Sequence, residues 1–320
     1  MKAIKVALVG AGYMATEHAK AFSSLPGVAL AGVFSRTRTR AEQLASSCPG
    51  MVVCDSVGEL YERTRADLVV VTVKELSMAA IAAECFAFPW AVLLEKPAGY
   101  DLADATSILE AATKVGNKAG SRAYVALNRR AYSSTRQALA RLADNAGPRF
   151  VKVMDQQDQQ AARDVYKEPP EVVRNYMYAN SIHLIDYFRV FGRGEVTGVV
   201  PVVPWIPEKP GMVVSKIEFS SGDVGLYEGV WDGPGPWAVS VVTPRERLEM
   251  RPLEQVAVQL RGERKVTALD FDPDDTAFKP GLRYQALQAV AAVRGEPNRL
   301  PTLADSWQSM SLVARIFGLA

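Results

Sequence analysis

Short apolar runs alternate with helical patterns through the first half of the chain. The apolar runs cover residues 4–10, 28–34, 67–73, 91–95 and 122–128. Near-continuous Val, Leu and Ile are typical of strands covered on both faces. Apolar positions recur with helical spacing at 13–24, 38–47, 77–87, 102–115 and 131–144. Strand–helix alternation at this spacing predicts a right-handed, doubly wound parallel sheet.

The pattern changes near Gly147-Pro148. A helix is expected at about 172–192, and helical patterns at 281–294 and 302–318 close the chain. Strand-like runs cover 149–156, 195–204, 212–220, 223–231, 237–243, 246–251 and 255–260. Consecutive strands joined by close turns favour antiparallel pairing.

The predicted class is therefore α/β with two domains. Residues 1–122 are expected to form a dinucleotide-binding Rossmann domain with a doubly wound parallel sheet. Residues 123–320 are expected to form an α+β domain with a mostly antiparallel open sheet, for substrate binding and oligomerisation. The C-terminal helix could pack back on the first domain.

A glycine-rich turn follows the first predicted strand and opens the first predicted helix. Residues 10–15 read Gly-Ala-Gly-Tyr-Met-Ala, a G-x-G-x-x-A pattern. Gly10 permits the tight turn, and Gly12 lets the backbone approach a pyrophosphate at the helix N-terminus. We expect Gly10, Gly12, Tyr13 and Met14 to contact a dinucleotide; the alternative is a tight turn without a ligand.

The end of the second predicted strand bears on which dinucleotide is bound. An NAD site usually has an acidic residue here for the ribose hydroxyls, whereas this chain has Ser35-Arg36, then Arg38 and Arg40. A hydroxyl and a guanidinium suit a 2′-phosphate, so NADP is favoured over NAD, which stays possible. Ser35, Arg36 and Arg40 are the expected contacts. Arg38 and Arg40 could alternatively be solvated helix residues.

The stretch "VLLEKPAG" places Glu95, Lys96 and Pro97 at the end of the fourth predicted strand. Ligands of open α/β sheets bind at the carboxyl ends of strands. A lysine there could donate to a substrate oxygen during hydride transfer. We therefore expect this tripeptide, together with Thr72 after the third predicted strand, to contact the cofactor.

Three motifs together resemble one oxidoreductase family. "GAGYMA" at 10–15, "EKP" at 95–97 and "SIHLIDYF" at 181–188 resemble the glucose–fructose oxidoreductase, inositol dehydrogenase and rhizopine-catabolism family, Gfo/Idh/MocA. The resemblance covers essentially the whole chain. It implies an NAD(P)-dependent oxidoreductase acting on a carbinol or carbonyl carbon of a sugar, nucleotide sugar or cyclitol. It further implies that Lys96 hydrogen-bonds the reacting oxygen, that His183 is the acid–base residue, and that the open sheet face forms a homodimer or homotetramer.

The chain departs from the family pattern at two places. Many members have Asp four residues before the histidine and Gly two residues before it; here these positions are Ala179 and Ser181. The loop 72–78 also lacks the Pro and His that the family tends to have. Asn180 or Asp186 could replace the missing acid, Asp186 by accepting from the imidazole of His183.

Other polar residues near the expected site could bind substrate hydroxyls or a charged group. The candidates are Tyr124, Asn128, Arg129, Tyr176 and Asn180. Tyr124 could equally be a core residue, and the arginines fit an anionic sugar or surface ion pairs. Three other functions stay open on the same fold: redox-neutral use of a bound cofactor, a cofactor-binding regulator, and imine reduction.

The composition limits the classes of binding partner that we expect. Lys and Arg number 37 against 35 Asp and Glu, which gives no reason to expect nucleic acid or a membrane surface. Three cysteines show no metal spacing and fit a reducing compartment, so no metal is expected. No apolar stretch approaches the roughly 18 residues needed to span a bilayer. The expected protein is cytoplasmic and acts on a small molecule.

Overall fold

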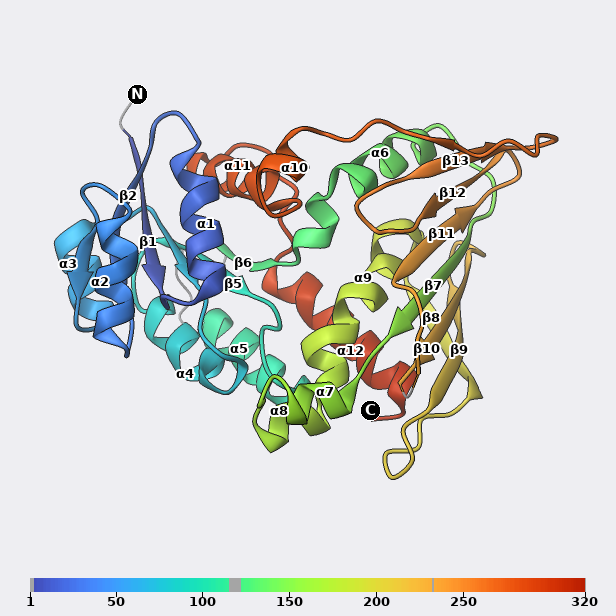
Figure 1. Ribbon diagram of the computed structural model, residues 1–320, viewed down its shortest axis with the longest axis horizontal. Coiled ribbons are helices and arrows are strands. Elements are labelled where there is room, and N and C mark those ends of the chain that lie inside the picture. The colour runs from blue at the N-terminus through green and yellow to red at the C-terminus, as the bar shows by residue number, and fades with distance from the viewer. Residues whose placement is uncertain (1–2, 115–121, 232, 320) are drawn as a thin grey trace. The chain divides into compact units, whose positions relative to one another are not determined.

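The computed structural model describes residues 3–114, 122–231 and 233–319, and the chain divides into two compact units (Figure 1). The first unit is Met1–Asn128 with Asp274–Trp307, and the second is Arg129–Pro273 with Gln308–Ala320. The predicted boundary after residue 122 falls before a strand of the first sheet, so the first unit extends to Asn128. Residue 115, the last of the predicted helix 102–115, lies outside the described residues.

The first unit contains a six-stranded sheet in the order β3-β2-β1-β4-β5-β6. Its strands are β1 (Ile4–Val9), β2 (Val28–Phe34), β3 (Val52–Cys54), β4 (Leu68–Val71), β5 (Ala91–Glu95) and β6 (Ala123–Ala126). Every neighbouring pair is parallel. This order is that of a doubly wound dinucleotide-binding sheet, which confirms the predicted Rossmann fold.

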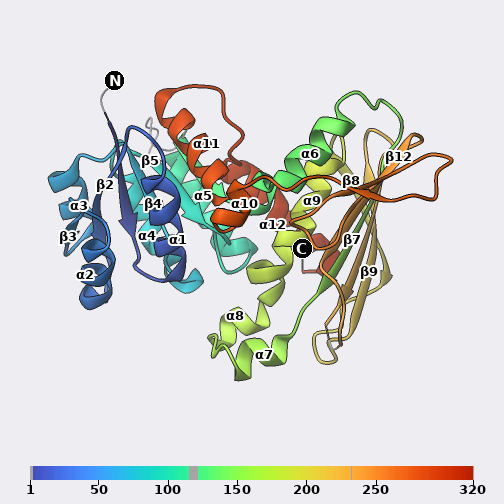
Figure 2. The same cartoon turned by 45° about the horizontal axis from the view of Figure 1, so that its top comes forward.

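Helices cover this sheet. The helices of this unit are α1 (Tyr13–Ser23), α2 (Arg38–Ser46), α3 (Val57–Thr64), α4 (Glu75–Phe86), α5 (Leu102–Lys114), α10 (Asp274–Ala277) and α11 (Leu282–Arg294). Although α11 is distant in sequence, it lies beside α1 (Figure 1, Figure 2). Leu282, Ala286 and Ala289 join Ala15 and Phe22 in one buried cluster. A helix from the C-terminal part of the chain thus completes the core of the first unit.

Strand β3 and helix α3 are absent from the sequence-based prediction. The strand has only three residues, and so short a run gives no clear strand signal in the sequence. The helix begins with a capping box: the Ser56 hydroxyl accepts from the Glu59 N–H, and the Glu59 carboxylate accepts from the Asp55 N–H. Because of the added strand, the Glu-Lys-Pro stretch follows the fifth strand in sequence rather than the fourth.

The second unit contains an eight-stranded sheet in the order β14-β13-β12-β11-β7-β10-β9-β8. Its strands are β7 (Phe150–Gln156), β8 (Val196–Val203), β9 (Met212–Phe219), β10 (Val224–Val230), β11 (Ala238–Val242), β12 (Glu246–Met250), β13 (Ala257–Leu260) and β14 (Thr267–Ala268). Only β7 and β10 pair in parallel, so the sheet is mostly antiparallel, as predicted. Outer strand β8 exposes Val200, Val202 and Val203; assembly through this face stays a prediction.

The predicted helix at 172–192 is in fact broken. It consists of α8 (Pro170–Arg174), a π-helix (Met177–Ser181) and α9 (Ile182–Phe191). The other helices of this unit are α6 (Ser133–Leu142) and α7 (Gln159–Asp164), while α12 (Leu303–Phe317) begins in the first unit and ends in the second. Single π turns inside helices are frequent at functional sites, and this one directly precedes α9, which contains His183.

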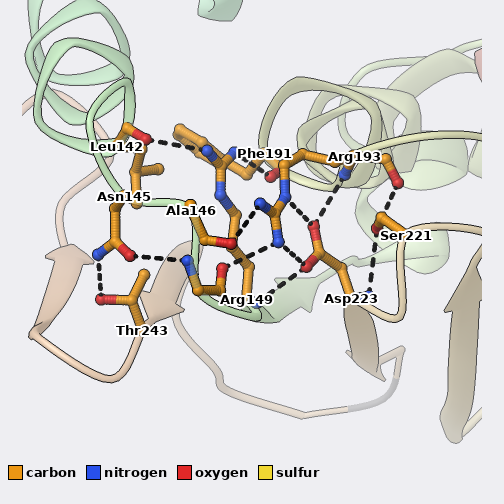
Figure 3. Close-up of polar contacts among 10 residues, drawn as sticks. Leu142, Asn145, Ala146, Arg149, Phe191, Arg193, Ser221, Asp223 and Thr243 are labelled. Atoms are coloured by element: carbon orange, nitrogen blue, oxygen red, sulfur yellow. Dashed lines mark hydrogen bonds and ion pairs between the residues drawn. The ribbon is translucent and has the colours of Figure 1, made fainter.

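An ion-pair cluster fixes the start of the β7–β10 strand pair (Figure 3). The Asp223 carboxylate accepts from the guanidinium of Arg193, from its backbone N–H and from the N–H of Arg149. Arg149 in turn donates to the carbonyl oxygens of Leu142 and Phe191, at the ends of α6 and α9. One buried carboxylate therefore connects the start of the central strands to both helices.

Three further observations concern the described residues alone. None of their helices is long and apolar enough to cross a membrane. They contain no group of His, Cys, Asp and Glu side chains that could hold a metal ion. Cys48, Cys54 and Cys85 are buried and free.

Candidate functional site

A pocket of about 210 Å³ surrounds the glycine-rich turn of the first unit. It lies where β1, β2 and β4 end, at the carboxyl edge of the parallel sheet. Its lining residues are Val9, Gly10, Ala11, Gly12, Phe34, Ser35, Arg36, Thr37, Arg40, Thr72, Val73, Lys74 and Ile81. Six of the predicted cofactor residues, Gly10, Gly12, Ser35, Arg36, Arg40 and Thr72, are among them.

Gly10 is required by the geometry of this turn, whereas Gly12 leaves its backbone open. Gly10 has φ +103°, and a Cβ there would lie 2.6 Å from the Thr72 hydroxyl oxygen. A Cβ on Gly12 would meet nothing within 4 Å, so the backbone is open to the pocket there. Gly12 is also the N-cap of α1, which has neither a side-chain cap nor an acidic residue in its first turn. The turn therefore fits a dinucleotide pyrophosphate, which needs close backbone approach and uncapped N–H groups.

The three arginines after β2 have different surroundings. Arg38 forms ion pairs with Glu42 and Asp55, so it is committed to surface contacts. Arg36 is exposed at the pocket, and its Nη2 donates to the Ser77 hydroxyl at 3.1 Å. Arg40 also lines the pocket. No acidic side chain is among the lining residues, so the pocket offers hydroxyl and guanidinium donors and no carboxylate for a ribose diol.

The Glu-Lys-Pro turn is anchored to the glycine-turn helix. Nε2 of His18 on α1 lies 2.7 Å from Oε1 of Glu95, and both side chains are buried. The other Glu95 oxygen accepts from the Lys96 N–H at 3.1 Å, and the Lys96–Pro97 peptide is cis. Glu95, Lys96 and Pro97 are not among the residues that line the 210 Å³ pocket. The Glu95 carboxylate thus positions the turn, which sequence reasoning had not foreseen.

Four other predicted residues of the first unit also lie outside that pocket lining. Tyr13 is exposed beneath the Lys279 ammonium, which is 5.4 Å from its ring centroid. Met14 and Tyr124 pack against the buried cluster of α1 and α11. Asn128 is buried and donates to the Pro280 carbonyl oxygen at 3.2 Å. Their observed contacts are thus within the first unit.

In the second unit, His183 lies near Trp237 and Arg129. The His183 side chain is in the first turn of α9 and only 7% exposed. Its ring centroid is 6.3 Å from that of Trp237, and the Arg129 guanidinium carbon is 4.8 Å from the Trp237 ring centroid. Trp237 precedes β11 and was not predicted from the sequence.

A buried carboxylate, also not predicted, lies at the end of β7. Asp155 is 1% exposed and accepts from the Tyr227 hydroxyl at 2.8 Å and the Gln157 amide at 2.6 Å. Gln157 in turn accepts from Asn180 at 2.8 Å, and Asn180 lies 3.4 Å from the Tyr176 hydroxyl. Burial raises the pKa of Asp155. A polar chain therefore links this acid to two predicted substrate residues, Asn180 and Tyr176.

The Asp186 carboxylate, predicted as an acceptor for the His183 imidazole, is held by Arg130 and Ser309. Arg130 donates to both of its oxygens, at 2.7 and 2.6 Å, and the Ser309 hydroxyl donates at 2.6 Å. Burial opposes ionisation of Asp186, but the Arg130 charge overcomes it and lowers the pKa of this carboxyl. Asp186 is therefore a structural partner of Arg130.

A larger pocket of about 900 Å³ adjoins the end of β7 within the second unit. Trp231 and three prolines supply apolar surface, and the lining contains as many acidic as basic side chains. The lining residues are Gln156, Asp158, Gln159, Gln160, Arg163, Glu168, Pro170, Val173, Arg174, Glu208, Lys209, Pro210, Trp231, Gly233 and Pro234. An aromatic face with mixed hydrogen-bonding groups suits a polar ligand of sugar size.

The fold and the glycine-turn pocket are those of a dinucleotide-binding protein. Residues 4–122 match the family model described as "Oxidoreductase family, NAD-binding Rossmann fold", and the protein is an NAD(P)-dependent oxidoreductase. The matched model is that of the Gfo/Idh/MocA family, and the match covers the dinucleotide-binding part of the chain. The family resemblance inferred from its sequence motifs is thereby confirmed.

Solved structures share the fold over the whole chain. One, assigned as an NADPH-dependent oxidoreductase of Desulfitobacterium hafniense, has 15% identity and a TM-score of 0.81, covering 100% of this chain and 96% of its own. The UDP-N-acetylglucosamine 3-dehydrogenase of Acidithiobacillus ferrooxidans has 15% identity and a TM-score of 0.77, with 100% and 99% covered.

A levoglucosan dehydrogenase, solved with NADH and levoglucosan, has 16% identity and a TM-score of 0.78, covering 100% of this chain and 97% of its own. At such identities the likeness shows the fold alone. No curated protein matches the sequence.

Proposed function

We propose that the protein binds NADP in preference to NAD. The observation that supports this is the pocket after β2, where Ser35, Arg36 and Arg40 are present and no carboxylate is among the lining residues. A 2′-phosphate accepts from a hydroxyl and from the planar guanidinium fork. A ribose diol would lack the acidic acceptor that NAD sites usually supply.

We further propose that the substrate is a sugar, nucleotide sugar or cyclitol. When bound, the dinucleotide supplies or accepts the hydride. The family match supports this reaction class, and two proteins of the same fold are named as dehydrogenases of UDP-N-acetylglucosamine and levoglucosan. The sugar-sized polar pocket beside Trp231 is compatible with such a substrate.

Two side chains have the proposed chemical roles. The Lys96 ammonium donates a hydrogen bond to the reacting oxygen, from a turn held by the His18–Glu95 contact. His183 takes the hydroxyl proton in oxidation and returns it in reduction, because an imidazole exchanges protons near neutral pH. Asn180, held by Gln157, hydrogen-bonds a substrate hydroxyl.

Cofactor titration of an arginine pair tests the NADP assignment. Arg36→Gln is expected to weaken NADPH binding by about 30-fold, the value of a charge-assisted contact, and to leave NADH binding nearly unchanged. Arg38→Gln is the matched control because Arg38 is committed to Glu42 and Asp55. Fluorescence titration with both cofactors measures the effect. Tighter binding of NADH than NADPH by the unmodified protein would contradict the proposal.

A further inference from the structure

Two consecutive arginines of the second unit have opposite surroundings. Arg130 donates two hydrogen bonds to the carboxylate of Asp186. Arg129 is half-buried, and its Nε has no hydrogen-bond acceptor among the described residues. Its guanidinium lies instead over the ring of Trp237. Arg129 is therefore held by a π face rather than by an acid.

The Trp237 ring is fixed in place. Its Nε1 donates to the Gln156 carbonyl oxygen at 2.6 Å, at the end of β7. The same indole is the near neighbour of His183. An aromatic face stabilises a cation without using its N–H donors. The donors of Arg129 thus stay available for a ligand in the neighbourhood of His183.

The buried acid nearby does not neutralise Arg129. The charge of Arg129 opposes the rise that burial causes in the pKa of Asp155. The oxygens of Asp155, however, accept from Tyr227 and Gln157. A cation that is partly withdrawn from water and paired with no acid is costly unless something else supplies an acceptor. An anionic ligand at the Nη groups of Arg129 would supply that acceptor.

We infer that Arg129 binds an anionic group of the substrate, a carboxylate or a phosphate. The inference rests on the proposed function and narrows its substrate class to acidic sugars, meaning uronates, sugar phosphates or nucleotide sugars. The planar guanidinium fork matches both anions in a two-point contact. Because Arg129 and His183 lie against the same indole, the anionic group binds close to the carbon that reacts.

Matched sugar pairs test this inference. The protein is saturated with NADPH and titrated calorimetrically with D-glucose, D-glucuronate and D-glucose 6-phosphate. At least one acidic sugar is expected to bind about 30-fold more tightly than glucose, the worth of a charge-assisted contact. Which acid is preferred distinguishes a carboxylate from a phosphate. Arg129→Gln is expected to abolish this preference, and Arg129→Lys to retain only part of it.

Arg264→Gln is the control, since it removes the same charge from an exposed position of the second unit that lines neither pocket. It is expected to keep the preference for the acidic sugar. Equal binding of all three sugars, no binding of either acid, or a preference that survives Arg129→Gln would overturn the inference. NADPH affinity is measured on the unmodified protein and on each variant. If the unmodified protein did not bind NADPH, that result would count against the proposed function rather than against the role of Arg129.

Discussion

The two ends of the β7–β10 strand pair hold buried aspartates in opposite ways. At the start, Asp223 accepts from the Arg193 guanidinium and from two backbone N–H groups. Burial alone would raise the pKa of Asp223, but the hydrogen bonds from Arg193 lower it. At the other end Asp155 accepts from the neutral side chains of Tyr227 and Gln157, and burial raises its pKa.

The difference separates a structural region from a functional one. Where cation and carboxylate meet directly, both are satisfied and no ligand is needed. At the Asp155 end, the cation Arg129 lies on Trp237 while the acid is held by neutral donors. Charges that are kept apart in this way remain available to a substrate, at some cost in stability.

The largest expected effect comes from breaking the satisfied end. Asp223→Asn is expected to lower the free energy of unfolding by about 3 kcal/mol, because it leaves Arg193 without its charge partner. Urea unfolding measures the loss. Asp144→Asn, at an exposed acid near the same cluster, is the control. Equal stability of the two variants would contradict the structural role of Asp223.

The same variant should also change the acid sensitivity of folding. The folded-state pKa of Asp223 is lowered, so its contribution is complete above the unfolded value of about 3.9 and is lost as pH falls through the folded value. Asp223→Asn is expected to remove this acid-induced loss. A variant that destabilises on acidification as steeply as the unmodified protein would argue against it.

A smaller effect is expected at the neutral end. Tyr227→Phe removes a donor to the Asp155 carboxyl and should cost about 2 kcal/mol in unfolding free energy. Tyr187→Phe is the matched control: it is equally buried, but its hydroxyl only meets that of Thr135 at 3.2 Å. That control should cost about 1 kcal/mol or less. Thermal unfolding of both variants measures the two losses of stability. A larger loss for Tyr187→Phe than for Tyr227→Phe would contradict the prediction.

The smallest expected effect is a pH dependence of opposite sign. The raised folded pKa of Asp155 means that its stabilisation is complete below about pH 3.9 and declines as pH rises through the folded value. Asp155→Asn is expected to lower the free energy of unfolding by about 1 kcal/mol in acid, because the amide forms one of the hydrogen bonds to Tyr227 and Gln157 less well. This loss is expected to become smaller as pH increases. Urea unfolding from about pH 4 to about pH 8 follows the trend. A cost that grows with pH would contradict it.

The sequence predicts the first sheet well because its strands are apolar on both faces and its glycine turn has a definite strand–helix context. It misses β3 because the strand has only three residues. It merges α8, the π-helix and α9 because all three keep similar apolar spacing, and a π turn leaves no mark in that spacing.

The site is predicted where motifs are local and missed where contacts are distant. Residues at 10–12 and 35–40 lie together in sequence and in the pocket. Asp155, Tyr227 and Trp237 come from three separate strands or loops, so only the pairing of β7 with β10 and β11 brings them together. The sequence does contain one signal for this site. Asp155 follows Val151 and Val153 at alternate, core-facing positions of β7, where a carboxylate is unexpected.

The contact between His18 and Glu95 has an evolutionary consequence. A buried imidazole and a buried carboxylate 2.7 Å apart depend on each other, because replacing either one leaves the other unpaired in the interior. Selection therefore acts on the two positions as one unit, although 76 residues separate them between 18 and 95 in the chain. Related chains that lose the histidine are expected to have changed the glutamate as well, and with it the setting of the lysine that follows.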